Sequence, residues 1–223
     1  MTLHDAKAAL RFGRPLGSAR GAVLLIHGRG SSPEDIAGLA DALPEAGLAF
    51  LAPAAAGGEW YPRRFLAPLG ENEPWLSSAL AVVADLAAEV LAAGIPSERL
   101  GIAGFSQGAC LALEYAARHP RRYGFVAGLS GALIGPPGTP RPAGDLRATP
   151  VLLACAERDP HIPRAFVEAS AAAFVRLNAE VTTHIFPGSA HAVYPEEIGW
   201  LRQRLPFAGP DRGLPGRAGD APA

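Results

Sequence analysis

The chain has 223 residues, of which 49% are hydrophobic and 18% are charged, and its formal net charge is -1. This length and balance are typical of one soluble domain with a large buried core. A charge so close to zero gives no electrostatic basis for binding nucleic acid or an anionic membrane, so neither is expected as a partner.

The amino-terminal segment predicts neither export nor membrane insertion. Residues 1–10 lack the continuous apolar run of a signal peptide, and the longest apolar segment, residues 76–95, is interrupted by Asp85 and Glu89. The two cysteines, Cys110 and Cys155, are expected to be small core residues rather than a disulfide. Together these features favour a cytoplasmic location.

Apolar runs alternate with helical patterns in the first half of the chain. After a start that is expected to be flexible and that includes His4, residues 22–28 and 48–53 predict buried strands. Between these strands, Ser32 precedes a proline and two acidic residues, a pattern that predicts a helix reaching about residue 43. Residues 72–93 predict a long helix, because apolar side chains recur at steps of four and three.

The same alternation continues in the second half. Residues 99–105 predict a strand that leads directly into a helix ending before Pro120. Three more strands are predicted at residues 124–130, 150–157 and 180–188, and two helices at about 162–177 and 195–205. This order predicts an α/β fold with a mostly parallel central sheet and helices on both faces.

Two segments rich in glycine and proline set the domain boundary and exclude a cap. Residues 208–223 have almost no large apolar side chains, so we expect one domain over residues 1–207 followed by a disordered tail. The connection at 129–149 has too many prolines and glycines to form helices. We therefore expect no helical cap domain over the sheet.

Ser106 lies in the sequence Gly104-Phe105-Ser106-Gln107-Gly108, between a predicted strand and a predicted helix. Glycines at both ends of such a pentapeptide permit a sharp turn and let the helix approach the strand, which exposes the serine hydroxyl as a nucleophile. A serine that only caps the helix would fit the same five residues. The neighbouring loops decide between the two interpretations.

A serine nucleophile needs a histidine base, and the base needs an acid that orients it. His191 follows the last predicted strand, at the edge of the sheet where Ser106 should emerge, and is the candidate base. Asp159 follows another strand and is the candidate acid, with Glu157 as the alternative. His161, directly after these acidic residues, is assigned to the start of a helix.

Two backbone amides are candidates for an oxyanion hole. One is the N–H of Gln107, directly after the nucleophile, and the other is the N–H of Arg29, in the loop after the first buried strand. Gly28 and Gly30 give that loop the freedom to aim an amide inward. A plain strand-to-helix turn would use the same glycines.

Four motifs, LLIHGRGSSPEDI, GFSQGA, DPHIP and GSAHAV, occur in this order over about residues 22–205. Together they resemble the phospholipase/carboxylesterase family of α/β-hydrolases, which includes the acyl-protein thioesterases. The resemblance implies an α/β-hydrolase fold and a cofactor-free serine hydrolase acting on carboxylic ester or thioester bonds. It also implies a triad of Ser106, Asp159 and His191, with Arg29 and Gln107 at the oxyanion positions.

Residues 54–75 look more like those of bacterial carboxylesterases than those of the eukaryotic thioesterases. Trp60, Tyr61 and Phe65, with Trp75, supply apolar area that is expected to line an acyl or aryl groove. In the alternative interpretation these rings only cover the edge of the sheet. Arg63 and Arg64 have two interpretations as well: they attract an acidic substrate, or they form a solvated face.

These features predict a serine carboxylesterase that hydrolyses esters of small to medium acyl or aryl groups through an acyl-enzyme. Alternatives are an acyl thioesterase or lysophospholipase, a peptidase, and a non-catalytic binding module. The expected partner is a small-molecule ester, and no cofactor or metal is expected. A homodimer in which a second subunit covers the apolar groove remains an open alternative.

Overall fold

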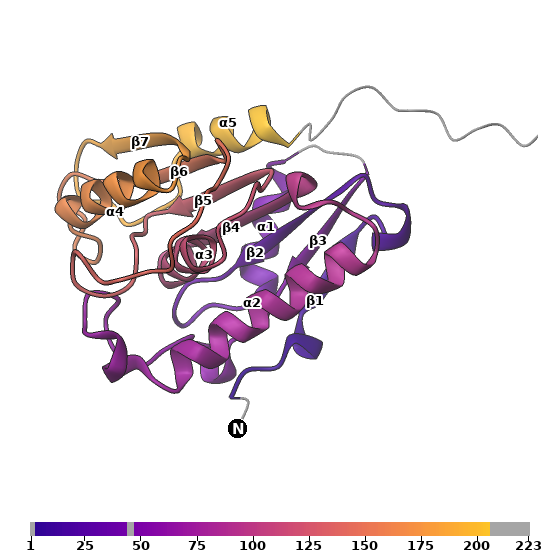
Figure 1. The fold of residues 1–223 in the computed structure, drawn as a ribbon, viewed down its shortest axis with the longest axis horizontal. Helices are drawn as coiled ribbons and strands as arrows, with labels where there is room; N and C mark the ends of the chain where they lie inside the picture. The colour runs from indigo at the N-terminus through magenta and orange to yellow at the C-terminus, as the bar shows by residue number, and fades with distance from the viewer. Residues whose placement is uncertain (1–2, 44–46, 206–223) are drawn as a thin grey trace, which may run out of the picture.

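A single sheet organises the chain in the computed structural model, which describes residues 3–43 and 47–205 (Figure 1). Its strand order is β1-β3-β2-β4-β5-β6-β7, in which β1 pairs antiparallel and every other neighbouring pair is parallel. The strands are β1 (Leu10–Gly13), β2 (Gly21–Ile26), β3 (Leu48–Ala52), β4 (Leu100–Phe105), β5 (Phe125–Leu129), β6 (Pro150–Ala156) and β7 (Glu180–Phe186). The predicted mostly parallel α/β architecture is confirmed.

Helices cover both faces of this sheet. They are α1 (Pro33–Asp41), α2 (Trp75–Ala92), α3 (Gln107–Arg118), α4 (Arg164–Arg176) and α5 (Pro195–Arg204). The predicted start of α1 is confirmed: Ser32 accepts a hydrogen bond from the Asp35 amide, the Asp35 side chain accepts one from the Ser32 amide, and Pro33 takes the first helical position.

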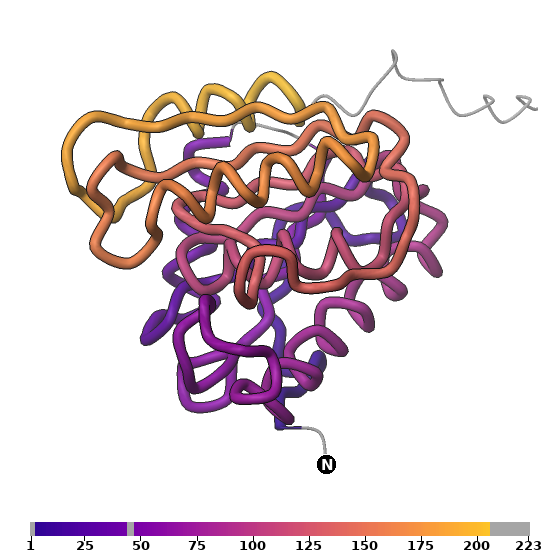
Figure 2. Tube along the Cα trace, turned by 60° about the vertical axis from the view of Figure 1, so that its left-hand side comes forward, coloured from indigo at the N-terminus to yellow at the C-terminus, as the bar shows by residue number. Residues whose placement is uncertain are grey.

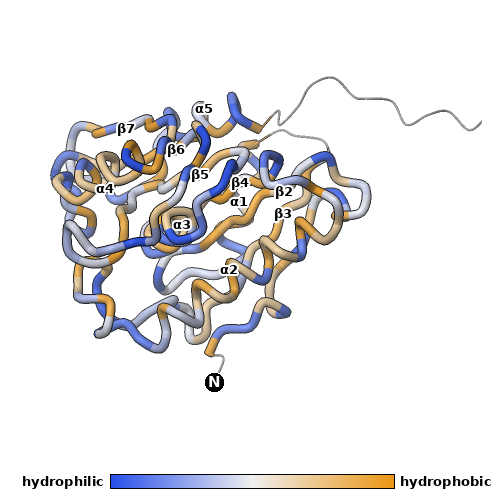
Figure 3. Tube along the Cα trace, in the orientation of Figure 1, coloured by the Kyte–Doolittle hydropathy of each residue, from blue (hydrophilic) through white to orange (hydrophobic). Residues whose placement is uncertain are grey.

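Two hydrophobic cores lie on opposite faces of the sheet, and β2 contributes to both. Leu24 and Ile26 belong to the core shared with α2, α3 and α4, whereas Val23 and Leu25 belong to the core shared with α1 and α5. Because successive side chains of a strand point to opposite faces, a strand buried on both sides needs an unbroken apolar run. In Figure 3 these central strands are largely orange, the colour of hydrophobic residues.

The strand order changes direction next to β2, and this change creates the crevice of the molecule. From β2 the chain passes to β3 on one side and then returns to β4 on the other side. The loops after β2 and β4 therefore separate at the carboxyl edge of the sheet, where a doubly wound fold binds its ligands. In register, Ile26 at the end of β2 lies opposite Gly104 near the end of β4.

The amino terminus of α3 contacts the end of β2 backbone to backbone. A β-carbon added to Gly108 would lie 2.1 Å from the carbonyl oxygen of Ile26, and one added to Gly104 would lie 2.3 Å from the carbonyl oxygen of Gly108. Both distances are far shorter than any real contact of a β-carbon. The two glycines of the pentapeptide are therefore required by the close approach of strand and helix.

Two expectations about the first residues are wrong. The chain adds an antiparallel edge strand, β1, whose apolar alternation of Leu10 and Phe12 extends over only four residues and is too short to predict a strand. His4 is not in a flexible start: it is buried, and its amide donates to Ser78 Oγ at 3.0 Å. An amphipathic ring held by distant partners is a tertiary effect that local sequence does not reveal.

Other expectations concern the long connections and the tail. Within the described residues, the 130–149 segment contains turns but no helix, which agrees with the absence of a helical cap. The predicted tail lies outside the described residues. The helix α2 is long and apolar enough to cross a membrane by length and composition, but half of that window is buried in the fold, as in a core helix.

We predict that Gly108→Ala destabilises the protein. The added methyl group meets the Ile26 carbonyl, so α3 must move away from β2, and such overpacking lowers the free energy of unfolding by about 1–3 kcal/mol. Urea denaturation measures this value. Gly70→Ala is the matched control, because its added β-carbon meets nothing within 4 Å. Equal stability of the two variants would contradict the proposed contact.

Candidate active site

Ser106 occupies a sharp turn between β4 and α3. Its backbone angles are φ 55° and ψ -117°, a region that a residue with a side chain rarely adopts. The turn is held by the Ser106 amide, which donates to the Leu129 carbonyl of β5 at 3.0 Å, and by the Cys110 amide, which donates to the Ser106 carbonyl at 3.0 Å. The strained turn presents the serine hydroxyl at the carboxyl edge of the sheet.

His191 and Asp159 meet Ser106 in a continuous chain of hydrogen bonds. Nε2 of His191 lies 2.8 Å from Oγ of Ser106, and Nδ1 of His191 lies 2.8 Å from Oδ2 of Asp159. The three residues come from the loops after β7, β6 and β4. The structure thus brings together the three residues that strand-end reasoning selected, although 85 positions separate Ser106 from His191.

The carboxylate of Asp159 is oriented by its own loop. Its Oδ1 accepts hydrogen bonds from the amides of His161 at 2.8 Å and Ile162 at 2.9 Å, which leaves Oδ2 for His191. Asp159 is buried, whereas Glu157, the alternative acid, is exposed and faces Arg158. Of the two acids, Asp159 is therefore the one that orients His191.

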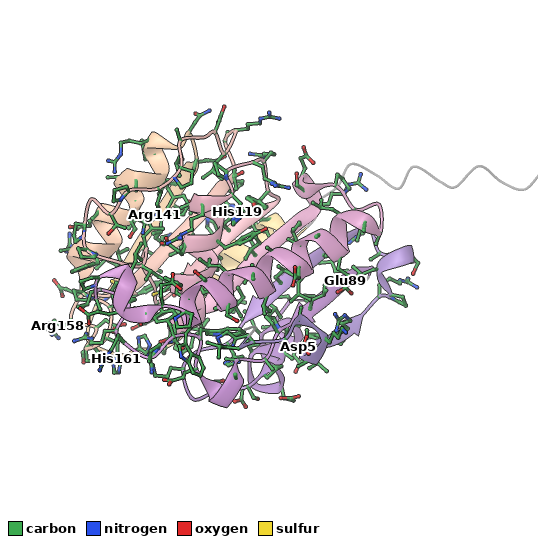
Figure 4. The ribbon with its side chains drawn as sticks, turned by 60° about the horizontal axis from the view of Figure 1, so that its bottom comes forward. Asp5, Glu89, His119, Arg141, Arg158 and His161 are labelled. Carbon is green, nitrogen blue, oxygen red and sulfur yellow. The ribbon has the colours of Figure 1, made fainter. Side chains whose placement is uncertain are left out.

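The ring of His191 is fixed from several sides. It lies between the rings of Phe105 and His161, with centroid distances of 5.0 and 4.8 Å. Its loop is tied to the loop after β6, because the Arg158 amide donates to the Gly188 carbonyl at 2.9 Å. His161 precedes α4 rather than starting it and faces the same cleft, a placement that the sequence did not indicate. In Figure 4 it lies well away from Glu89 of α2.

The amides of Arg29 and Gln107 both remain available. Neither amide donates to another group among the described residues. Gly28, beside Arg29, approaches Ser106 so closely that an added β-carbon would lie 3.4 Å from the Ser106 β-carbon. Two free backbone donors therefore flank the serine on loops that the sheet holds in place, an arrangement suited to binding an oxyanion.

The side chain of Gln107 ties this turn to the long connection between β3 and α2. Its Oε1 accepts from the Trp60 amide at 2.9 Å, and its Nε2 donates to the Tyr61 carbonyl at 2.8 Å. The sequence predicted a role for the backbone of Gln107 and none for its side chain. The connection itself is visible as the violet loops at the lower end of the molecule in Figure 2.

Trp60 does not line the cleft, contrary to the sequence-based expectation. Its side chain is fully buried, and its Nε1 donates to the His27 carbonyl at 2.9 Å, so the indole holds the loop after β2 from beneath. Trp75 is also absent from the cleft and packs against the core and the ring of His4. Large aromatic rings bury well whether or not they touch ligand, so their position in the sequence does not separate the two roles.

Two buried histidines that the sequence analysis did not assign to the site support the loop after β2 and the Trp60 segment. His27 Nδ1 donates to the Gly28 carbonyl at 2.7 Å, while its Nε2 accepts from the Ala55 amide at 3.1 Å. His4 makes the equivalent pair with the Trp60 carbonyl and the Ala56 amide. Burial lowers the pKa of both imidazoles, so each acts as a neutral connector with one donor and one acceptor.

The cleft above Ser106 has a volume of about 540 Å³. Tyr61 and Phe65 line it, as expected, together with Phe105, Ile162 and Cys110. Cys110 and Cys155 are both free and buried, which confirms their expected role as core residues. Burial raises the pKa of the Cys110 thiol to about 12, so this sulfur does not compete with Ser106 as a nucleophile near neutral pH.

This arrangement is suited to acyl transfer. A hydroxyl that is hydrogen-bonded to an oriented imidazole can attack a carbonyl carbon, and two free amides beside it can stabilise the oxyanion that forms. The described residues contain no group of three histidine, cysteine, aspartate or glutamate side chains placed to hold a metal ion.

A family model described as Phospholipase/Carboxylesterase matches residues 13–206 of this chain. The crystal structure of a phospholipase/carboxylesterase from Dyadobacter fermentans DSM 18053 is similar to this structure, with a TM-score of 0.86 and 38% sequence identity. That match covers 92% of this chain and 98% of the Dyadobacter chain. Strands β2 to β7 and the loops that carry the site fall within the region that the family model matches, and the fold is an α/β-hydrolase fold.

Two curated proteins are related to shorter parts of the chain. "Putative esterase NocK" of Nocardia uniformis subsp. tsuyamanensis is 35% identical over 161 residues, which are 70% of this chain and 43% of that protein. Acyl-protein thioesterase 1 of Gibberella zeae is 32% identical over 120 residues, which are 51% of each protein. The chain thus spans about half the length of the curated relatives that it matches.

A buried carboxyl, Glu197, supports the His191 loop from below. Its Oε2 accepts from the Tyr194 amide at 2.7 Å, whereas Oε1 has no hydrogen-bond partner among the described residues. The Tyr194 ring stacks on Phe186 at the end of β7, and its hydroxyl donates to the Ala190 carbonyl, next to His191. Burial raises the pKa of Glu197 to about 7.

We predict that Glu197→Gln changes how stability depends on pH. The folded protein binds the Glu197 proton more tightly than the unfolded chain, so this contribution is present below the ordinary pKa of 4.5 and is lost as pH rises through about 7. Between about pH 5 and 8, the free energy of unfolding of the wild type should fall relative to that of Glu197→Gln by up to about 3 kcal/mol.

Chemical denaturation across this pH range measures the difference. Glu71→Gln removes an exposed carboxyl that does not contribute to the raised pKa of Glu197, and it should leave the pH dependence as in the wild type. Parallel curves for the wild type and Glu197→Gln would show that Glu197 does not titrate in this window.

Proposed function

Because this chain belongs to the phospholipase/carboxylesterase family of carboxylic ester hydrolases, we propose that it is a serine carboxylesterase that uses Ser106, His191 and Asp159. The observation that carries the proposal is the hydrogen-bonded chain from Ser106 Oγ through His191 to Asp159, with a 2.8 Å distance at each step. Its substrates are esters of small to medium acyl or aryl groups, a size that suits a cleft of about 540 Å³.

In the first half-reaction, the Oγ of Ser106 bonds to the ester carbonyl carbon while its proton passes to Nε2 of His191. The carbonyl oxygen takes the negative charge and accepts hydrogen bonds from the amides of Arg29 and Gln107. When the carbonyl re-forms, the bond to the alcohol oxygen breaks, and His191 returns the proton to the departing alcohol. The acyl group is then an ester of Ser106.

In the second half-reaction, His191 takes a proton from water, and the resulting hydroxyl attacks the acyl carbon. Collapse of this intermediate breaks the bond to Ser106 Oγ and releases the carboxylic acid, while His191 returns the proton to the serine. Asp159 keeps the His191 ring in one tautomer and stabilises the imidazolium present in both steps. Its own two amide bonds hold it in place.

Thioester hydrolysis is the second candidate, and it is favoured by the relatives named acyl-protein thioesterase 1. The same nucleophile and oxyanion donors serve both bonds, because the acyl carbon is attacked in the same way. The leaving group differs: a thiolate departs with less need for a proton from His191 than an alkoxide does. Lysophospholipids and amides are further substrates that the same chemistry would permit.

We predict that Ser106→Ala abolishes ester hydrolysis. Without the nucleophile, kcat/KM for p-nitrophenyl acetate should fall by about 10⁴-fold or more, since the other groups of the site cannot form an acyl-enzyme. The wild type should also be labelled at Ser106 by a fluorophosphonate. Ser77→Ala, an exposed position on α2, is the matched control and should keep full activity and labelling. A Ser106→Ala protein that is folded and fully active would exclude the mechanism.

We predict that the protein cleaves oxygen esters efficiently, and that its preferred acyl length is the same for oxygen esters and for thioesters. One cleft receives the acyl group in either case, so kcat/KM should peak at the same length in matched series of p-nitrophenyl esters and acyl thioesters. The ratio of kcat/KM for the thioester to kcat/KM for the oxygen ester can be compared with the ratio of their rates in alkaline hydrolysis. If the enzymatic ratio is the larger one at every acyl length, the protein is instead a thioesterase. Comparable turnover of anilides would favour a peptidase.

A further inference from the structure

Arginine side chains line the cleft above Ser106, and no carboxylate is among the described residues of its wall. Among the described residues that line it, Arg29, Arg63 and Arg64 carry positive charge, and none carries a carboxyl group. The whole chain has a net charge of -1, so this concentration of arginine does not reflect the composition of the protein. A cleft lined by charge of one sign raises the local concentration of ligands of the opposite sign.

The three arginines differ in how their charge is used. Arg29 forms an ion pair with Glu59 and donates to the carbonyls of Tyr61 and Arg63, so its guanidinium is a structural brace. The guanidinium of Arg63 has no hydrogen-bond or ion-pair partner among the described residues. In the part of the chain that the structure describes, the Arg64 guanidinium donates to one acceptor, the neutral carbonyl of His161, at 3.3 Å. Two positive charges therefore remain uncompensated at the cleft.

The backbone beneath these two arginines is held rigidly, which distinguishes it from an ordinary solvated loop. Asn72 is fully buried, and its Oδ1 accepts from the Arg63 amide at 2.8 Å while its Nδ2 donates to the Arg64 carbonyl at 3.4 Å. The next carbonyl, of Phe65, accepts from the Gly135 amide at 2.6 Å. A rigid support reduces the entropy lost when a side chain binds a ligand, so it favours a recognition role.

We propose that Arg63 and Arg64 bind a carboxylate carried by the substrate at a distance from the scissile ester bond. The inference rests on the proposed esterase function and names the class of ester that the site selects. The planar guanidinium of arginine matches a carboxylate in shape and donates two parallel hydrogen bonds to it. The apolar wall of Tyr61, Phe65 and Ile162 contacts the hydrocarbon that joins the carboxylate to the ester.

Two matched substrate pairs test this selectivity. In the first pair the charge is on the acyl side: the mono-p-nitrophenyl ester of suberic acid and the same compound with its free carboxyl methylated. In the second pair the charge is on the alcohol side: 4-acetoxybenzoate and its methyl ester. For each pair, the quantity of interest is the ratio of kcat/KM for the charged substrate to kcat/KM for the neutral one.

The wild type should show a ratio above one for at least one pair, after correction for the alkaline hydrolysis rates. Arg63→Gln should lower that ratio about fivefold, the factor expected for one partly exposed ion pair, and Arg63→Gln with Arg64→Gln should lower it further. Added salt should lower the wild-type ratio and have little effect on that of the double variant. Arg99→Gln is the control, because this exposed arginine precedes β4, at the opposite edge of the sheet.

The possible failures are distinct. If the wild type hydrolyses the neutral esters in a Ser106-dependent reaction but the ratio is the same in the double variant, the carboxylate site is wrong and the esterase assignment stands. If the wild type hydrolyses neither member of either pair, the esterase assignment falls and the substrate class falls with it. A ratio that Arg99→Gln lowers as much as Arg63→Gln would point to the overall charge of the protein and would also overturn the site.

Discussion

The geometry of the candidate site depends on a contact between two stretches of backbone. The first turn of α3 lies directly against the last carbonyl of β2, with no side chain between them, because Gly108 takes the contact position. This contact brings the loop after β2 beside Ser106, so that Arg29 and Gln107, whose amides make no hydrogen bond among the described residues, line the same cleft. The strained turn at Ser106 is tolerated because the sheet and the helix fix both of its ends.

Buried polar side chains hold the loops of the site by bonding to their backbone groups. Buried neutral rings of His4 and His27 join backbone groups that no strand or helix pairs, and the Asn72 amide does the same beneath the two arginines. Each buried polar group must have a partner, so a long connection without regular structure needs such side chains. The loop that shapes the cleft is consequently as well supported as the loops that carry the chemistry.

The six parallel strands, the five α-helices and the positions of Ser106, Asp159 and His191 were accessible from the sequence, because they follow from periodicity and from the rule that parallel strands end at one edge. The choice of Asp159 over Glu157 agreed with the structure for a reason the sequence could not supply, namely the two amides that orient its carboxylate. Trp60 was wrongly predicted to line the cleft, because a sequence does not distinguish an aromatic ring that packs under a loop from one that contacts a ligand. β1 was missed because it has only four residues, so its alternation of Leu10 and Phe12 with Arg11 and Gly13 is too short to stand out.

The double attachment of Gln107 has a consequence for how this enzyme class diversifies. Its amide directly follows Ser106 and is free among the described residues, while its side chain holds the backbone of Trp60 and Tyr61. The connection between β3 and α2, which lines the cleft, is therefore not structurally independent of the turn at Ser106. Replacing it with the corresponding segment of a relative would remove these two hydrogen bonds and alter the position of the residue that follows Ser106, so changes in the cleft wall and changes in the turn at Ser106 are coupled.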